Sequence, residues 1–289
     1  MSPVGNIRIG ELARRVGVAP ELLRAWESRY GLVVPIRSPG GFRLYSADDE
    51  RRVRAMLEHL RRGYSASEAA RLAAAEGERA REGDRPELVD GLRGLASALD
   101  AFDEAGANAA LDRLLAAFTV EMVLHRVVLP YLRELGERWE RGEASVAQEH
   151  FASNLLRARL LGLARGWGGG VGPRALLACT PRELHDLALI VFGLALRGGG
   201  WRVTYLGPDT PPATLASAAE ELRPDLVAVA ATTEASFEDL HDDLHALSER
   251  WRLALGGPGA TPAQADALGA ELLAGDPIAA AEAVIAPPR

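Results

Sequence analysis

The C-terminal part of the chain alternates short apolar runs with stretches of helical periodicity, and this pattern restricts the fold more than any other feature. The runs are RALLACT (174–180), WRVTYLG (201–207), DLVAVAA (225–231) and WRLALGG (251–257). Each is short enough for a buried strand, and each gap between them is long enough for a helix. Such alternation is typical of βαβ units, so we expect a doubly wound parallel sheet from residue 171 to residue 289.

The middle of the chain has a different pattern. Residues 91–168 carry Leu, Ala, Val and Phe at helical spacing without a strand pattern, which predicts a bundle of about four helices. Residues 74–90 are charged, contain Gly and Pro and lack an apolar stripe. We expect a linker there, with helix in part of it.

The N-terminal part contains two short helical patterns joined by GVAP (17–20), which together predict a helix-turn-helix. A Pro-Gly-Gly sequence (39–41) between two β-compatible runs predicts a small hairpin. Ser46 is then expected to cap a helix, and a last helix is expected to start at Ser65 or Ser67.

Charge is distributed unevenly along the chain. Residues 1–72 hold 13 Arg against 8 acidic residues, a net charge of +5. Because the whole chain carries −7, residues 73–289 carry −12. A basic unit on an acidic body indicates that the first domain meets a polyanion. There is no apolar run of about 18 residues and no signal-peptide pattern, so a cytoplasmic protein without membrane contact is expected. The single Cys179 excludes an intrachain disulfide, and its apolar setting predicts a buried thiol.

These patterns predict a multidomain α+β chain. We expect a winged helix-turn-helix over residues 1–73, a linker over 74–90, a helical bundle over 91–170 and a Rossmann-like doubly wound sheet over 171–289.

Three blocks stand out in the N-terminal part: IGELA (9–13), LRAWE (23–27) followed by RYG (29–31), and GGFRLYS (40–46). Together they resemble the winged helix-turn-helix of MerR-family transcription regulators. In such a motif the second helix reads the major groove and the hairpin contacts phosphates. We therefore expect double-stranded operator DNA as a partner and Trp26 in the core. The candidate DNA contacts are Arg24, Arg29, Tyr30, Arg37, Arg43 and Tyr45.

Glu183 and His185 form the sharpest constellation of the C-terminal part. They lie in a loop between a predicted strand and a predicted helix, where doubly wound sheets bind ligands. A carboxylate beside a His fixes the tautomer and raises the basicity of the ring, as metal-ligating His residues require. The alternative is a His at a helix start with a solvated Glu.

The segment resembles the cobalamin-binding module with an Asp-x-His-x-x-Gly motif. The resemblance implies that His185 is the lower axial ligand of cobalt and that Asp186 lies at the cofactor. It also implies that Thr232, Thr233, Gly256 and Gly257 flank the displaced nucleotide tail. Two positions depart from the motif. Glu183 replaces Asp, and its longer side chain can still reach the imidazole; Ala188 replaces Gly, and its methyl group is expected to narrow the space near the tail.

The stretch RWERGEASVAQEHFA (138–152) breaks a helical pattern inside the predicted bundle. Gly142 is suited to end one helix, and Ser145 followed by Gln148 is a capping-box pattern that starts another. The helix ends beyond a Trp, and the next begins with a Glu-His pair. Taken alone, the pair is either ordinary packing or the lid of a ligand site.

Trp139, Glu149 and His150 match a Trp-x9-Glu-His motif. With the N-terminal blocks and the Glu-x-His loop, the chain resembles the CarH/LitR group of cobalamin-dependent photoreceptor regulators over nearly its whole length. In that group the motif covers the upper face of the corrin. The resemblance implies adenosylcobalamin as chromophore and dark tetramers that bind the operator as a repressor. It also implies that light breaks the cobalt–carbon bond and ends both assembly and repression.

Glu140 departs from the group, whose members carry a His directly after the Trp as the light-state cobalt ligand. Carboxylate oxygen suits cobalt with a nitrogen lower ligand less well than imidazole does. We therefore hypothesise that the light product lacks two imidazole ligands. Water, Glu140 or a shifted His150 would then take the sixth position.

Other functions stay open from the sequence. One is a corrinoid-carrying enzyme module, although the three predicted domains leave no segment for a substrate barrel, so a non-enzyme is expected. Another is a cobalamin-level sensor without a light response. A third is a degenerate fold that senses another signal or acts without a ligand. Because MerR-type heads bind two-fold operators, a homo-oligomer, at least a dimer, is expected in each regulator case.

Overall fold

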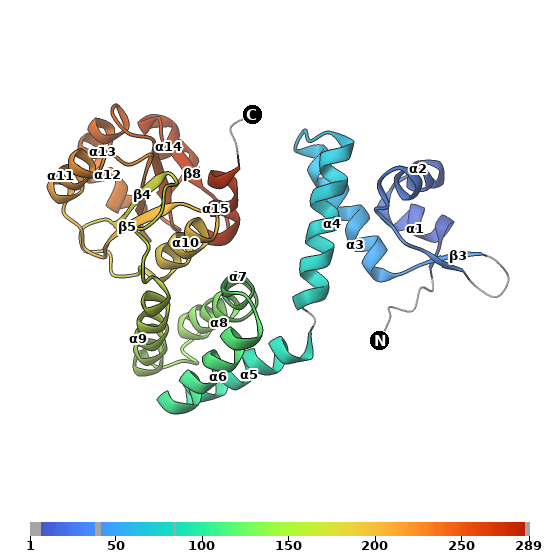
Figure 1. The fold of residues 1–289 in the computed structure, drawn as a ribbon, viewed down its shortest axis with the longest axis horizontal. Coiled ribbons are helices and arrows are strands. Elements are labelled where there is room, and N and C mark those ends of the chain that lie inside the picture. Colours follow the sequence, from blue (N-terminus) through green and yellow to red (C-terminus); the bar gives the residue numbers. More distant parts are fainter. Residues whose placement is uncertain (1–6, 38–41, 84, 287–289) are drawn as a thin grey trace. The chain divides into compact units, whose positions relative to one another are not determined.

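The chain forms two compact units in the computed structural model, Met1–Val89 and Asp90–Arg289 (Figure 1). The structure describes residues 7–37, 42–83 and 85–286. Over these ranges no helix has the length and apolar character needed to cross a membrane.

A helix-turn-helix begins the first unit, as predicted. Helix α1 (Ile9–Val16) ends at Gly17, whose φ of 70° is left-handed, and α2 (Pro20–Tyr30) begins with a proline. Glycine adopts the left-handed region without steric cost, and the first N–H of a helix has no intrahelical partner that proline could remove. Leu23 and Trp26 on α2 are buried with α1 in the core of this unit, so the expectation that Trp26 is a core residue is confirmed.

Three short strands form an antiparallel sheet in the order β1-β3-β2. They are β1 (Ile7–Arg8), β2 (Ile36–Arg37) and β3 (Arg43–Tyr45). Strands β2 and β3 make the predicted hairpin, whose Pro-Gly-Gly turn lies outside the described residues. Strand β1 was not predicted, because two residues are too short to show an alternating pattern; it is held by pairing with β3.

Two longer helices complete the first unit. Helix α3 (Ala47–Arg61) starts at a capping box between Ser46 and Asp49, so Ser46 is the N-cap as predicted. Helix α4 (Ala66–Gly83) starts after Ser65, whose hydroxyl accepts from the Glu68 amide. Because α4 continues to Gly83 and the next helix begins at Pro86, most of the stretch expected as a linker (74–90) is helical.

The second unit begins with the predicted bundle. Its described part contains α5 (Pro86–Asp100), α6 (Glu104–Ala117), a third helix made of α7 (Val120–Val123), η1 (Leu124–Val128) and α8 (Leu129–Glu140), and α9 (Val146–Leu163). The η1 segment is a π-helical turn. Such turns occur inside α-helices near functional sites more often than elsewhere, and this one precedes the helix that ends at Trp139 and Glu140.

Five parallel strands follow in the order β5-β4-β6-β7-β8. They are β4 (Arg174–Cys179), β5 (Arg202–Gly207), β6 (Leu226–Ala230), β7 (Leu253–Gly256) and β8 (Glu271–Leu273). The first four are the predicted apolar runs, whereas β8 was missed because it is a short edge strand without such a run. The chain reverses direction across the sheet between β4 and β6, which makes their carboxyl ends the switch point where this topology binds ligands.

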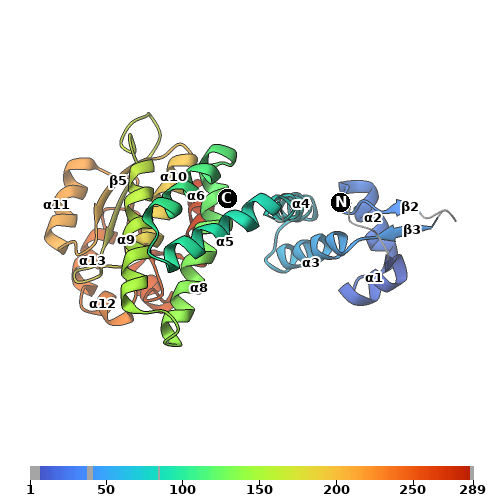
Figure 2. The same ribbon diagram turned by 90° about the horizontal axis from the view of Figure 1, so that it is seen from below.

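Helices cover both faces of the sheet, so the doubly wound arrangement is confirmed (Figures 1 and 2). On one face α10 (Leu187–Gly198) packs against α15 (Pro277–Ile285), and α9 of the bundle packs on α10. The other face is covered by α11 (Pro212–Leu222), the short α12 (Glu234–Glu238), α13 (His241–Ser248) and α14 (Pro262–Leu268). Cys179, at the end of β4, is buried as predicted, and this burial raises the pKa of its thiol to about 12.

Candidate functional site

The loop between β4 and α10 holds Glu183 and His185 at the switch point of the sheet. Glu183 is 5% exposed and accepts hydrogen bonds from the backbone amides of His185 (2.8 Å) and Thr232 (2.7 Å) and from the Thr232 hydroxyl. Burial by itself would raise the pKa of this carboxyl, but the hydrogen bonds, led by that of the Thr232 hydroxyl, outweigh burial and lower it. Glu183 is therefore a fixed, ionised anchor beneath the loop.

His185 projects outward from this anchor, and its side chain is 76% exposed. Its Nδ1 lies 2.7 Å from Glu183 Oε1 and donates its proton to that carboxylate. The other ring nitrogen, Nε2, then faces solvent on a ring of fixed orientation, which is the arrangement of a metal-ligating imidazole. The longer Glu side chain thus reaches the ring, as expected for the replacement of Asp.

The loop after β6 meets the same anchor. Thr232 bonds to Glu183 through both its amide and its hydroxyl, and the Thr233 hydroxyl lies 2.7 Å from the Ser236 hydroxyl. The structure therefore brings Thr232 and Thr233 to the loop of His185, although 49 residues separate Glu183 from Thr232.

Two glycines in the loop after β7 allow the backbone of that loop to lie directly against the backbone of the loop after β6. A Cβ on Gly257 would lie 2.3 Å from the Ala231 carbonyl oxygen, and one on Gly259 would lie 2.4 Å from the Thr233 carbonyl oxygen. At Gly256 the nearest atom to an added Cβ is 3.4 Å away, an ordinary contact. The close approach therefore requires Gly257 and Gly259, and the second of these was not predicted because its partner backbone is remote in sequence.

Thr180, at the end of β4, is 1% exposed. Its amide donates to the Ala230 carbonyl (3.1 Å), but its hydroxyl has no hydrogen-bond partner among the residues that the structure describes. Buried hydroxyls are normally hydrogen-bonded, so this position suits a bound group that would supply a hydrogen-bond partner for the hydroxyl. The sequence did not single it out, because a Thr at a strand end has no distinguishing pattern.

Asp186 lies directly after His185 but turns inward. It is 2% exposed, and its Oδ2 accepts from Arg157 Nε on α9 (2.6 Å) and from the Tyr205 hydroxyl on β5. This corrects the expectation of a direct cofactor contact, because the carboxylate already faces two protein donors inside the unit. Ala188 is exposed on the first turn of α10, so its methyl group points to solvent.

The turn between α8 and α9 presents the second group of candidate residues. Gly142 (φ 71°) follows the end of α8, and Ser145 and Gln148 form the predicted capping box of α9. Trp139 is 52% exposed at the end of α8, and Glu140 beside it is also exposed. A large indole at the surface marks a place where a ligand or partner can cover apolar area.

Asp100, at the end of α5, fixes both sides of this turn. Arg138 Nη1 lies 2.9 Å and 3.1 Å from the two carboxylate oxygens of Asp100, and Gln148 Nε2 donates to its carbonyl (3.2 Å). Hydrogen bonding to Asp100 is the main cause that raises the pKa of Arg138. The turn is therefore held by the bundle itself.

Helix α9 runs from this turn toward the loop of His185. His150 Nε2 lies 3.6 Å from Glu149 Oε2, and the Ser153 hydroxyl donates to the same carboxylate (2.6 Å). Arg157, which reaches Asp186, follows His150 by about two helical turns, so the two side chains share one face of α9. Figure 2 shows that α9 begins at the same end of the second unit as α12, the helix that follows β6 along the chain.

In the first unit, four of the predicted DNA contacts lie at the surface. Arg24 and Arg29 are exposed on α2, and Arg37 and Arg43 are exposed on the hairpin strands. Tyr30 is half-buried, with the Arg29 guanidinium 6.0 Å from its ring centre. The arginines therefore supply positive charge on both elements that a winged helix-turn-helix presents to DNA.

Tyr45 differs from the expectation. It is fully buried, and its hydroxyl donates to Glu27 Oε2 (3.0 Å), while Arg43 Nε donates to Glu27 Oε1 (3.0 Å). Burial, and then the bond to Glu27, raise the pKa of Tyr45 to about 12. The predicted direct DNA contact by Tyr45 is corrected, because its side chain holds the hairpin to α2 from inside the core.

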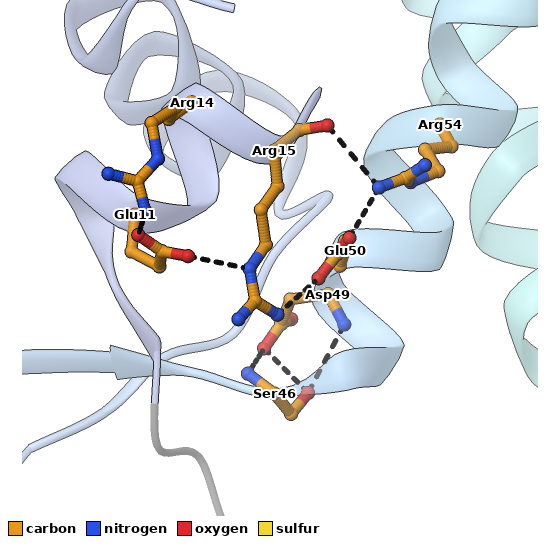
Figure 3. Close-up of polar contacts among 7 residues, drawn as sticks. All are labelled: Glu11, Arg14, Arg15, Ser46, Asp49, Glu50 and Arg54. Atoms are coloured by element: carbon orange, nitrogen blue, oxygen red, sulfur yellow. Dashed lines mark hydrogen bonds and ion pairs between the residues drawn. The ribbon is translucent and has the colours of Figure 1, made fainter. Parts of the chain in front are cut away.

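A polar network joins α1 to α3 (Figure 3). Arg15 donates to Glu11 (2.8 Å) and to Glu50 (3.3 Å), and Arg54 donates to Glu50 and to the Arg15 carbonyl (3.3 Å). These contacts fix α1, and with it the turn that leads to α2, on the start of α3. They were not visible in the sequence because 35 residues separate Arg15 from Glu50.

Comparison with known proteins follows the same division of the chain. A MerR HTH family regulatory protein model matches residues 7–76, and two B12 binding domain models match residues 92–161 and 173–286. The HTH-type transcriptional repressor CarH of Myxococcus xanthus is 37% identical over 255 residues, which is 84% of this chain and 84% of that protein. The chain belongs to the CarH-like family of MerR regulators with B12-binding domains. The HTH-type transcriptional repressor CarA of the same organism is 36% identical over 261 residues, 88% of each chain.

The fold of the CarH-like second unit also occurs in a solved structure. The monomethylamine corrinoid protein of Methanosarcina barkeri superposes with a TM-score of 0.54 at 19% identity, covering 66% of this chain and 95% of that one. At this identity the likeness concerns the fold alone. A helical bundle followed by a parallel sheet is thus shared beyond the CarH-like regulators.

Proposed function

We propose that this CarH-like regulator is a light-responsive repressor with adenosylcobalamin as its chromophore. In this proposal residues 1–73 bind DNA, residues 91–170 form the lid over the cofactor and residues 171–289 hold it. The observation that carries the proposal is the His185 ring, whose Nδ1 is held by Glu183 at 2.7 Å while the other nitrogen faces solvent. Imidazole nitrogen presented in this way suits cobalt.

The residues at the switch point fit a corrinoid with a displaced nucleotide tail. His185 would bind cobalt from below, and Glu183 would keep the ring in the ligating tautomer. The buried Thr180 hydroxyl would find a hydrogen-bond partner in such a group. Thr232 and Thr233 lie in the neighbouring loop after β6, against which Gly257 and Gly259 of the loop after β7 are packed. Adenosylcobalamin, when bound, supplies a cobalt–carbon bond that visible light cleaves.

The lid residues complete the proposed site from the bundle. Trp139 offers an exposed apolar surface for the upper axial group, and Glu149 and His150 offer polar contacts beside it. Glu140 stands where the CarH/LitR group has a His, so we infer that this chain does not supply a second imidazole from that position. The turn that carries these residues is fixed by Asp100, which favours a preformed lid.

The first unit would hold double-stranded operator DNA, with Arg24 and Arg29 toward bases and Arg37 and Arg43 toward phosphates. Binding of a two-fold operator needs two heads, so we propose a homo-oligomer, at least a dimer, in the DNA-bound state. By resemblance to the CarH/LitR group, the dark holoprotein is a tetramer and light ends assembly.

The test is an absorption spectrum of full-length protein prepared with adenosylcobalamin in the dark, recorded before and after green light. Operator binding is measured on the same samples. We expect a bound corrinoid, a spectral change on illumination and a fall in operator affinity. His185→Ala should weaken corrinoid binding by about tenfold or more, whereas His245→Ala, an exposed His on α13, should not.

The other outcomes decide between the alternatives. Bound corrinoid with light-independent operator binding would replace the light sensor with a cobalamin-level sensor. Absence of bound corrinoid would mean that the fold senses something else or acts without a ligand. Full corrinoid affinity in His185→Ala would overturn the ligand role of this residue.

A further inference from the structure

One ion pair joins the helix that carries Glu149 and His150 to the loop that carries His185. Arg157 Nε on α9 lies 2.6 Å from Asp186 Oδ2, and the Asp186 side chain is 2% exposed. Over the described ranges this is the one ion pair between α9 and residues 174–286. A buried carboxylate bonded to a guanidinium is a strong and directional contact, so it fixes the distance between the two elements.

A second side chain holds Asp186 from the sheet. The Tyr205 hydroxyl on β5 donates to the same Oδ2 atom that accepts from Arg157. The Tyr205 ring meets Trp167 edge-on at 6.0 Å and 85°, and the Trp167 carbonyl accepts from the Val203 amide on β5 (2.8 Å). Trp167 follows the end of α9, so the sheet holds this helix near its end and at Arg157 in its middle.

Over the described residues, the side-chain hydrogen bonds of the first two turns of α9 lie within the bundle. Gln148 donates to Asp100, and Ser153 donates to Glu149 on the same helix. His150 lies about 10 Å before Arg157 along the helix axis, on the same face. Among the described residues, Arg157 is therefore the first on α9, counted from the lid, whose side chain makes a hydrogen bond or ion pair to the loop of His185.

We propose that Arg157 and Asp186 are positioning residues that set the spacing between the His185 loop and the Glu149–His150 face, and thereby select the upper axial group of the corrinoid. The inference rests on the proposed function, because it takes the corrin to lie between the loop and the lid. A bulky adenosyl group depends on contacts with the lid, whereas a small hydroxo ligand extends little toward it. Loss of the ion pair therefore weakens adenosylcobalamin binding selectively.

Binding titrations in the dark test this selection with two probes, adenosylcobalamin and hydroxocobalamin. In Arg157→Met we expect the affinity for adenosylcobalamin to fall about tenfold or more and that for hydroxocobalamin to fall less than about threefold. Arg157→Lys keeps the charge without the planar fork, so it should recover part of the loss. Arg159→Met is the matched control, because Arg159 lies two residues further along α9 and pairs with Asp112 inside the bundle.

Hydrogen exchange of the corrinoid-free chain provides a readout that does not need the cofactor. We expect faster exchange in Arg157→Met at the loop 180–187 and at the first turns of α9, with no such change in Arg159→Met. Equal losses for both corrinoids, or unchanged exchange, would overturn the proposal.

If the wild type binds neither corrinoid, the proposed function fails along with the selection, while the exchange data still decide whether Arg157 positions the loop. If Arg157→Met does not fold, Arg157→Lys takes its place and is compared with Arg159→Met in the same titrations and exchange measurements. Equal corrinoid affinities and equal exchange rates in these two variants would overturn the proposal.

Discussion

At the scale of single residues, the site depends on two buried carboxylates that accept hydrogen bonds from several protein donors. Glu183 is surrounded by donors from its own loop and from Thr232, so it can fix His185 without being exposed itself. Asp186 in turn accepts hydrogen bonds from Arg157 and Tyr205. Neighbouring acidic residues in one loop thus have different tasks, and burial together with donor positions distinguishes them.

The lowered pKa of Glu183 makes a prediction about stability. A carboxyl whose folded pKa lies below its unfolded value of about 4.3 contributes stability that is fully present above that pH. This contribution is lost as the pH falls through the folded pKa. Glu183→Gln should therefore lower the unfolding free energy at about pH 7, and its difference from the wild type should shrink as the pH falls below about 4. Urea unfolding over a series of pH values from about 7 downward measures this, and a difference that is independent of pH would contradict it.

Glu140 makes a second prediction at this scale. If the missing imidazole decides the light product, then illuminated wild-type protein should not match the spectrum of a bis-imidazole cobalamin standard. Glu140→His should shift the illuminated spectrum toward that standard, because imidazole is a better partner for cobalt than carboxylate. The dark spectrum should change little. A wild-type light spectrum that already matches the standard, and is unchanged in His150→Ala, would refute the hypothesis.

At the scale of elements, the sequence predicted whatever depends on local pattern. The apolar runs gave four strands, and the capping boxes at Ser46 and Ser145 gave two helix starts. Strand β1 depends on its pairing with β3, and Tyr45 bonds to Glu27, which lies 18 residues away, so no local pattern predicts either. The same holds for the candidate site, where the Glu-x-His loop was predictable but the inward turn of Asp186 was not.

The contact between the loops after β6 and β7 can be tested at Gly259. An added methyl group there would meet the Thr233 backbone at 2.4 Å, and backbone can move only by distorting the loop. We expect Gly259→Ala to lower the unfolding free energy by about 1–3 kcal/mol. Gly256→Ala is the control, because its nearest contact of 3.4 Å is tolerable. Urea unfolding of the corrinoid-free chain measures both, and equal effects would show that the close approach is not rigid.

The hairpin of the first unit makes a prediction about DNA. Arg43 is 44% exposed beside Glu27, so its guanidinium can reach a phosphate from the strand while one N–H stays bonded. Arg43→Ala should weaken operator binding and reduce the slope of log affinity against log salt by about one. Arg250→Ala, in the second unit, is the control. An unchanged slope in Arg43→Ala would indicate that Glu27 keeps Arg43 away from the phosphates.

At the scale of the whole molecule, charge separates the two tasks. Residues 1–72 carry +5 and the remaining residues −12, so DNA is attracted to the first unit and repelled by the second. Under the proposed function, a corrinoid signal in the second unit would therefore reach the operator through the number of DNA-binding units held together rather than through direct contact of the second unit with DNA. Linking heads raises their effective concentration on a two-fold site without any new contact to DNA.

This coupling predicts that assembly and operator affinity change together in the full-length chain. With adenosylcobalamin in the dark, light scattering after size exclusion should report a larger assembly than without corrinoid, and operator affinity should be higher by about tenfold or more. Green light should reverse both to the same extent. Hydroxocobalamin, which has no cobalt–carbon bond, serves as the control and should give an assembly that light does not alter. If illumination reduced the assembly while operator affinity stayed constant, the heads would act singly, and the signal would have to reach α2 by a change within the first unit.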